Sequence, residues 1–434
     1  MTKDYTIFKI ENYILKLTGL FNYDKSFFEK ALNSGYQELK YNDSDLEGFK
    51  DYFYPDFRKH FFSNDSIRHH ILISKANKNP IQNLCKFNKE CNVKVIESRL
   101  DLFDEGFGLF TLSIEIQTEI VSLAKFSDAA FLIRNFETPI LNSNYKKWHE
   151  YIENEILLGT ITKGNSIKVD EYSGSKYKLY MVLDIPELTE NAMMKSLLFD
   201  LGTLSTIGSS MGNNYDSMNK EFIDKLIQNN SISVYHNYEA LALLDTFTVV
   251  GNKLLDFDYK KEVYSSIYYC IFMYCLFIKF TLFKYSFEIT TLDEDRRDNF
   301  RHFLEKYYYH YISYNFLPNE IYNKIKIALD IDKELKFIDE KIVAIGQKIQ
   351  EKQQDRTNKI LAIVTVLTSV SSIEPIYDYL LKAQKVVGWK NEIYWSTIIS
   401  VLIVFFGGIV FYIFGRNILL WFNLKKDVIF KKKN

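Results

Sequence analysis

Residues 393–415 read IYWSTIISVLIVFFGGIVFYIFG and contain no charged side chain. A helix of about 23 residues is long enough to cross the ~30 Å hydrocarbon core of a bilayer. A single apolar segment of this kind has to be helical, because only a helix or a closed barrel satisfies its backbone hydrogen bonds in lipid. We therefore predict a membrane-spanning helix at these residues.

A second and more polar segment lies just upstream, at residues 360–381 (ILAIVTVLTSVSSIEPIYDYLL). Several hydroxyl groups and two carboxylates interrupt its apolar side chains. A helix that faces lipid on all sides has no use for such groups, whereas a helix that lines water does. The two segments predict a transmembrane hairpin, with a first span at about residues 360–381 and a second at about 393–415, that forms an ion pathway.

The composition of the chain restricts its partners and its location. Its 54 basic and 55 acidic residues leave no basic field, so we expect no direct binding of nucleic acid. The first residues lack the apolar stretch of a signal peptide. Basic residues flank the hairpin on both sides and include the cluster Lys431, Lys432 and Lys433. We expect a multi-pass protein of a bacterial inner (plasma) membrane, with both termini in the cytoplasm and reduced cysteines.

The segment from residue 1 to about 255 alternates short β-like runs with amphipathic stretches, which predicts a cytosolic α+β (α/β) domain. We expect helices at residues 27–35, 117–123 and 191–204. A hairpin connection is predicted at residues 101–108. Strands are expected at residues 70–74, 93–96, 110–116, 177–183 and 231–236.

From residue 256 to about 358 the pattern is helical. Residues 263–278 are apolar and aromatic, and they fit either a buried helix or a third membrane segment. The run is short for a crossing, and Lys279 and Lys284 follow it directly, which favours the buried helix by roughly three to one. We expect residues 359–434 to hold the hairpin and a basic cytosolic tail.

A heptad-like seam precedes the first span. Its isoleucines and leucine recur at alternating steps of four and three, as on the packed face of a helix. The polar segment 350–358 then joins residue 360 without a helix breaker, so we predict one stalk helix that runs into the membrane. The seam comprises Ile331, Leu335, Ile338, Ile342, Ile345 and Ile349.

The carboxy-terminal third resembles the CorA family of magnesium and divalent-cation channels. The resemblance covers about residues 320–434 and rests on RTNKILAIVTVLT (residues 356–368), a short outer loop, and an apolar second span with a lysine-rich tail. It implies a homopentameric funnel in which the stalk helix carries a pore-lining first span. Members of that family end the first span with Tyr-Gly-Met-Asn, where this chain has Tyr377-Asp378-Tyr379-Leu380. The resemblance therefore implies a channel, and the lost motif leaves its ion open.

One face of the predicted stalk and first span is polar. Five residues at steps of 3, 4, 3 and 4 fall on this face, and each would form a ring in a pentamer. Leu361 would form a hydrophobic constriction. The alternative is that the hydroxyls bond back to their own helix or join helix pairs; we favour pore lining by roughly two to one. The predicted pore-lining residues are Asn358, Leu361, Thr365, Thr368 and Ser372.

Carboxylates lie at the outer end of this span and on the stalk. Glu374, Tyr377 and Asp378 are predicted at the outer mouth, where carboxylates would concentrate cations; the alternative is that Pro375 ends the helix and both acids are solvated. Members of the family that are closed by Mg²⁺ bind the ion between cytosolic subunits, and the candidates for such a metal site here are Asp330, Asp332 and Asp339.

No motif of an enzyme is present, so we expect no catalytic activity. The first hypothesis is a CorA-like cation channel gated by its cytosolic domain. It is either a housekeeping transporter of Mg²⁺ or another divalent ion, or an effector of antiphage (CRISPR-associated) defence opened by a small nucleotide. The lost motif favours the effector. The second hypothesis is a membrane-anchored interaction protein that does not conduct.

Overall fold

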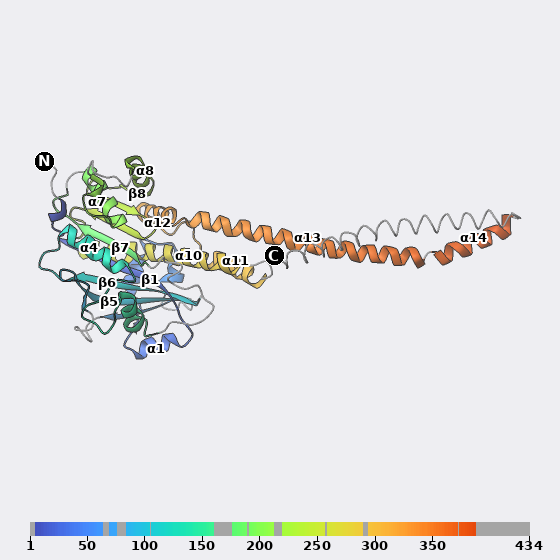
Figure 1. The fold of residues 1–434 in the computed structure, drawn as a ribbon, viewed down its shortest axis with the longest axis horizontal. Helices are drawn as coiled ribbons and strands as arrows, with labels where there is room; N and C mark the ends of the chain where they lie inside the picture. The colour runs from blue at the N-terminus through green and yellow to red at the C-terminus, as the bar shows by residue number, and fades with distance from the viewer. Residues whose placement is uncertain are drawn as a thin grey trace, which may run out of the picture. The chain divides into compact units, whose positions relative to one another are not determined.

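The computed structural model describes residues 5–63, 69–75, 84–104, 106–159, 176–188, 191–211, 219–256, 258–289, 294–371 and 373–387. The chain divides into two compact units at Ile342 and Val343. The first unit, Met1–Ile342, is built on one large sheet, and we call it the sheet domain. This architecture confirms the predicted mixture of helices and strands (Figure 1).

Within the described residues the sheet has ten strands in the order β2-β3-β5-β6-β1-β7-β10-β9-β8, with β4 paired to β5. Neighbouring strands are antiparallel except β7 and β10, which are parallel. The central strand β1 lies between β6 and β7, so β2–β6 are on one side of it and β7–β10 on the other. The strands are β1 (Asn12–Asn22), β2 (Gln37–Glu38), β3 (His69–Lys75), β4 (Leu84–Lys86), β5 (Asn92–Phe103), β6 (Phe107–Ile116), β7 (Lys178–Asp184), β8 (Ser231–Ile232), β9 (Tyr238–Ala242) and β10 (Thr246–Gly251).

The apolar side chains on one face of the sheet form the main hydrophobic core. Alternate residues of β1, such as Leu15 and Leu17, point into this core, because successive side chains of a strand face opposite ways. Trp148 is fully buried there and donates a hydrogen bond to the carbonyl of Ile133. The elements that cover this face are α1 (Phe27–Asn33), α4 (Leu123–Arg134), α5 (Trp148–Tyr151), η3 (Ile152–Ile156) and α7 (Asn191–Thr203).

A long helix, α10 (Tyr269–Glu288), packs on the opposite face of the sheet. It continues α9 (Asp258–Glu262) and the π-helical segment η5 (Val263–Tyr268). Among the described residues, the one helical stretch long and apolar enough to cross a membrane is Asp258–Phe287, and 83% of its most apolar window is buried within the protein. Phe277, for example, is fully buried against Phe103 of β5. This burial agrees with the prediction of a buried helix at residues 263–278.

Further helical segments complete the sheet domain. Phe57 and Phe61 of α3 pack edge-on against Tyr274 of α10, which places α3 on the same face. The remaining elements are η1 (Tyr5–Ile7), α2 (Asp43–Lys50), α3 (Pro55–Phe61), η4 (Ser209–Met211), α8 (Lys220–Asn230), α11 (Glu294–Tyr307) and α12 (Phe316–Ala328).

The predicted stalk is one continuous helix of 41 residues, α13 (Ile331–Ser371). Ile331, Ile338 and Ile342 of the predicted seam are buried. Lys279 forms an ion pair with Glu334, and Lys341 donates a hydrogen bond to the Ser286 carbonyl at 2.5 Å. The first turns of α13 are therefore fixed to α10 within the sheet domain.

The second unit contains the rest of α13 and α14 (Ile373–Val387). The predicted first span falls on these two helices, and Pro375 lies in the first turn of α14, where proline is tolerated. The predicted second span, at residues 393–415, lies outside the described residues.

Most of the predicted strands and helices are found, and two are corrected. Residues 117–123 do not form a helix; they form a connection, and α4 begins only at Leu123 because Ser122 caps it. The strand predicted at residues 231–236 is only Ser231–Ile232. The predicted hairpin connection is shorter than expected, since β5 and β6 extend to Phe103 and Phe107, and Gly106 supplies the positive φ of +82° that the turn requires.

Candidate functional site

The predicted pore-lining residues lie near the end of α13. Asn358, Leu361, Thr365 and Thr368 are all exposed in the single chain, at spacings that place them along one side of the helix. Ser372, the fifth residue of this predicted stripe, lies outside the described residues. The helix therefore brings four of the five predicted residues onto one continuous face.

The hydroxyl groups of this face bond back to their own helix. Thr365 donates to the carbonyl of Leu361 at 2.7 Å, and Thr368 is 2.9 Å from the carbonyls of Val364 and Thr365. This is the geometry of the alternative interpretation. A hydroxyl oxygen can accept as well as donate a hydrogen bond, and polar oxygens of this kind suit a pore wall that meets a hydrated cation.

The residues predicted at the outer mouth lie on α14. Glu374, Tyr377 and Asp378 are all exposed, and no ion pair of these carboxylates occurs among the described residues. Pro375 does not end the helix that carries them, because α14 continues to Val387. Glu374 and Asp378 are one turn apart and lie on the same side of α14.

The acidic candidates for a metal site on the stalk have other roles in the single chain. Asp330 has φ +52° at the junction of α12 and α13, and it pairs with Lys333. Asp332 is 3.0 Å from the ammonium group of Lys326 and accepts a hydrogen bond from Tyr308. Partial burial raises the pKa of Asp332, but these two contacts outweigh it and lower the pKa below its usual value. Asp339 is exposed. No group of three or more metal-ligating side chains occurs in the described part of the chain.

A cleft of about 680 Å³ opens on the α10 face of the sheet, and we call it the sheet cleft. Its floor is formed by β1, β5 and β6, and its wall by Lys261 of α9 and by Ser265 and Ser266 of η5. Two irregularities border it. The register of β5 against β6 shifts between Val95 and Glu97, and η5 is a π-helical segment. Both kinds of irregularity recur next to functional sites.

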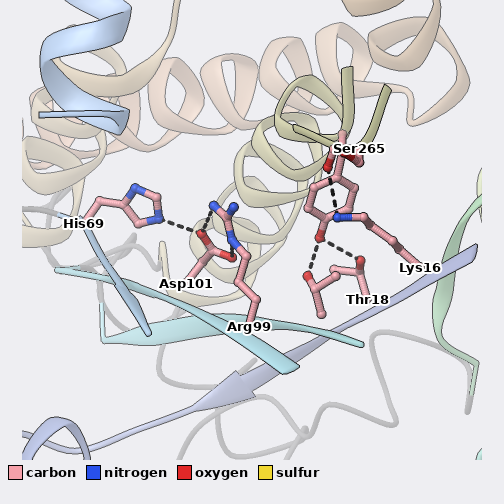
Figure 2. A network of polar contacts seen from close by, with 8 residues as sticks. Lys16, Thr18, His69, Arg99, Asp101 and Ser265 are labelled. Carbon is pink, nitrogen blue, oxygen red and sulfur yellow. Dashed lines mark hydrogen bonds and ion pairs between the residues drawn. The ribbon is translucent and has the colours of Figure 1, made fainter. Parts of the chain in front are cut away.

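Two cations occupy the buried part of the sheet cleft. Lys16 of β1 and Arg99 of β5 lie on either side of β6, where Ser113 is directly opposite Lys16. The Lys16 side chain donates to the carbonyl of Ser265 at 2.9 Å and lies 4.3 Å from the ring centroid of Tyr269 (Figure 2). Burial lowers the pKa of Lys16 to about 8, and Arg99 adds to this effect, whereas the carboxylates of Glu97 and Asp101 act in the opposite direction.

A fully buried carboxylate holds Arg99 in place. Arg99 donates two hydrogen bonds to Asp101, at 2.8 and 2.7 Å, and His69 lies 3.0 Å from the same carboxylate (Figure 2). Burial raises the pKa of Asp101, but Arg99 and His69 outweigh it and set the value at about 2. Tyr269 of α10 continues the polar contacts by hydrogen bonds with Thr18 and Thr111.

Sequence reasoning did not identify the residues of the sheet cleft. Lys16, Arg99, Ser113 and Ser265 are distant in the sequence, and no short motif contains them. One local signal was available. Lys16 interrupts the apolar run of residues 13–17 in a strand that is covered on both faces, where a charged side chain is unusual.

Comparisons of the chain with protein families, with curated proteins and with solved structures gave no match.

Proposed function

We propose that the chain is a CorA-like membrane channel. Five copies would surround a pore lined by the polar stripe of α13, and the sheet domain would gate the passage of a divalent cation. In this proposal a small ligand on the sheet domain opens the channel, as suits an effector of antiphage defence. Closure of a housekeeping transporter by intracellular Mg²⁺ is the second version.

The observation that carries the proposal is the exposure of the apolar end of α13. Ile360, Leu361, Ile363, Val364 and Leu367 are between 48% and 63% exposed in the single chain. Water-soluble monomers rarely leave so many large apolar groups together in solvent, so lipid or further copies of the chain must cover them. The same turns carry Thr365 and Thr368, which suits a helix with lipid on one side and a wet axis on the other.

The continuity of α13 supports a gating role for the sheet domain. The helix begins at Ile331 in contact with α10 and continues without a break to Ser371. A rearrangement at its first turns would therefore act on the same helix that carries the stripe. Asp332 belongs to these first turns and Lys326 to the preceding helix α12, and the contact between them sets the starting position of the stalk.

Flux measurements on purified protein in liposomes test the channel. We expect divalent-cation flux above that of protein-free liposomes. The substitution Thr365→Lys should reduce it roughly tenfold or more, because a ring of ammonium groups would face the permeating cation. Thr365→Ser is the matched control, since it keeps a hydroxyl group at the same position of the stripe. We expect little effect of this change.

Two results would overturn the channel. One is wild-type flux no greater than that of empty liposomes under every ligand condition. The other is an assembly in detergent whose mass corresponds to two copies rather than five. Both results would favour the alternative, a membrane-anchored interaction protein that does not conduct. The two versions of the channel are distinguished by measuring flux first without Mg²⁺ on the cytosolic side and then with nucleotides added. Closure by Mg²⁺ alone identifies the transporter, and opening by a nucleotide identifies the effector.

A further inference from the structure

We propose that the sheet cleft binds a small molecule through an anionic group, a phosphate or a carboxylate, that sits between Lys16 and Arg99. The binding step stands by itself. The gating role that we give to it rests on the proposed channel.

The first argument is the environment of Lys16. Its side chain is only 9% exposed, yet no carboxylate lies within ion-pair distance of its ammonium group among the described residues. A buried ammonium group is costly unless it is paired, and lysine is rarely buried without a partner. The carbonyl of Ser265 and the ring of Tyr269 compensate only part of this cost. Glu97 and Asp101 act on Lys16 only from beyond ion-pair distance, and an anion in the cleft would contact its ammonium group directly.

The second argument is the arrangement of the neighbouring donors. Lys16 and Ser113 are directly opposite each other on β1 and β6, and Arg99 is opposite Thr111 one step along β6. All these side chains point to the α10 face. Two cations and a hydroxyl group thus line one part of the cleft, and such groups recognise phosphate or carboxylate oxygens in proteins. Asp101 fixes the guanidinium of Arg99 through two hydrogen bonds, so this donor is preorganised.

The third argument concerns the size of the ligand. The cleft, at about 680 Å³, lies within the range of small-molecule sites. Three carboxylates, those of Glu11, Glu97 and Glu115, also line it, and two of them are exposed. They would repel a polyanion such as nucleic acid while leaving room for a single anionic group to reach the buried cations. The charge pattern therefore selects a small molecule.

Occupancy of the cleft has a structural route to the stalk. Ser265 and Ser266 belong to η5, which continues directly into α10. The far end of α10 contacts α13 through Lys279 with Glu334 and through Ser286 with Lys341. A ligand that competes with Ser265 for the Lys16 ammonium would release η5 from β1. That change would act at the helix on which the stalk is fixed.

Titration calorimetry on the full-length chain in detergent tests the site with defined probes: inorganic phosphate, AMP, citrate and adenosine. We expect AMP or citrate to bind, and inorganic phosphate to compete with it for the site. Adenosine should bind at least tenfold more weakly than AMP. Saturation by AMP but not citrate identifies a phosphate ligand, and the reverse identifies a carboxylate. Adenosine binding as tightly as AMP would overturn the proposal, as would the absence of binding by every anion.

Three variants separate binding from folding. Lys16→Met should weaken binding of the anion at least tenfold, and Lys225→Met, at an exposed lysine of α8, should leave it unchanged. Glu97→Gln removes a carboxylate opposite Ser113 and should strengthen the binding of inorganic phosphate two- to threefold. A folding defect cannot strengthen binding, so unchanged affinity in both Lys16→Met and Glu97→Gln would overturn the site.

Flux measurements on the same samples keep the two proposals apart. Binding of an anion without any cation flux would contradict the proposed channel and support the proposed binding site. If a ligand changes the flux equally in the wild type and in Lys16→Met, the result contradicts the proposed site and supports the channel. Loss of ligand-dependent flux in Lys16→Met alone is the result expected when both hold.

Discussion

Replacing Asp101 by alanine should destabilise the sheet domain by about 3–5 kcal/mol, because the substitution leaves the buried guanidinium of Arg99 without its anion. Asp101 is fully buried and accepts hydrogen bonds from Arg99 and His69 at 2.7–3.0 Å. No other carboxylate is within ion-pair distance of Arg99 among the described residues. The expected reading is a fall of roughly 6–20 °C in the melting temperature of the full-length chain in detergent.

A matched control is the exposed carboxylate of Glu47, which pairs with Lys50 at the surface. Glu47→Ala should change the melting temperature by less than about 2 °C, because exposed ion pairs contribute little. The conservative variant Asp101→Asn keeps an acceptor for His69 and removes the charge, so its melting temperature should lie between those of Asp101→Ala and the wild type. An Asp101→Ala chain that melts like Glu47→Ala would show that Arg99 finds another partner.

The pH dependence of this effect has a definite sign. The pKa of Asp101 is about 2 in the folded chain and 3.8 as its ordinary value. A carboxylate whose folded pKa is depressed stabilises the fold above its unfolded pKa, and this contribution is lost as the pH falls toward the folded pKa. The difference in melting temperature between Asp101→Asn and the wild type should therefore be largest near neutral pH and shrink between about pH 4 and pH 2.

The features predicted from the sequence are those that depend on local pattern. The seam of Ile331, Ile338 and Ile342 repeats at helical spacing within one segment, and the structure shows one long helix there. The strand at residues 110–116 and the buried helix at residues 263–278 follow in the same way from runs of apolar side chains. Each of these features is decided by residues within a few turns of one another.

The missed features depend on pairings between distant segments. Strand β1 was not predicted, although it lies at the centre of the sheet between β6 and β7. Its pairing with residues 178–184 joins residues that are 160 or more positions apart in the sequence, and no local pattern specifies that choice. The sheet cleft depends on the same pairings, because Lys16 faces Ser113 only once β1 lies beside β6. The helix predicted at residues 117–123 failed for the opposite reason, since the cap at Ser122 places the start of α4 later.

A second large loss of stability is expected when Phe277 is replaced by alanine. Phe277 of α10 is fully buried, and its ring stacks on Phe103 of β5 at 4.0 Å between centroids and meets Tyr307 of α11 edge-on at 5.2 Å. Removing a buried phenyl ring costs about 3–5 kcal/mol through lost burial and the cavity that remains. We expect the melting temperature of the full-length chain to fall by roughly 6–20 °C.

Phe287, on the same helix, is the matched control because its side chain is 62% exposed. Phe287→Ala should shift the melting temperature by no more than about 2 °C. Equal shifts for the two phenylalanine variants would mean that α10 is not packed on the sheet as described, and the assignment of residues 263–278 to a buried helix would then fail.

Together, the two expected losses distinguish packing from charge at the α10 face of the sheet. Phe277 and Asp101 both stabilise this face, but only Asp101 also orients Arg99 in the sheet cleft. Asp101→Asn should therefore weaken anion binding more than its melting temperature alone predicts. A milder packing variant, Phe277→Leu, should lower stability with the affinity for AMP retained. If the affinity for AMP falls in proportion to the melting temperature in both variants, Asp101 acts on the cleft only through folding.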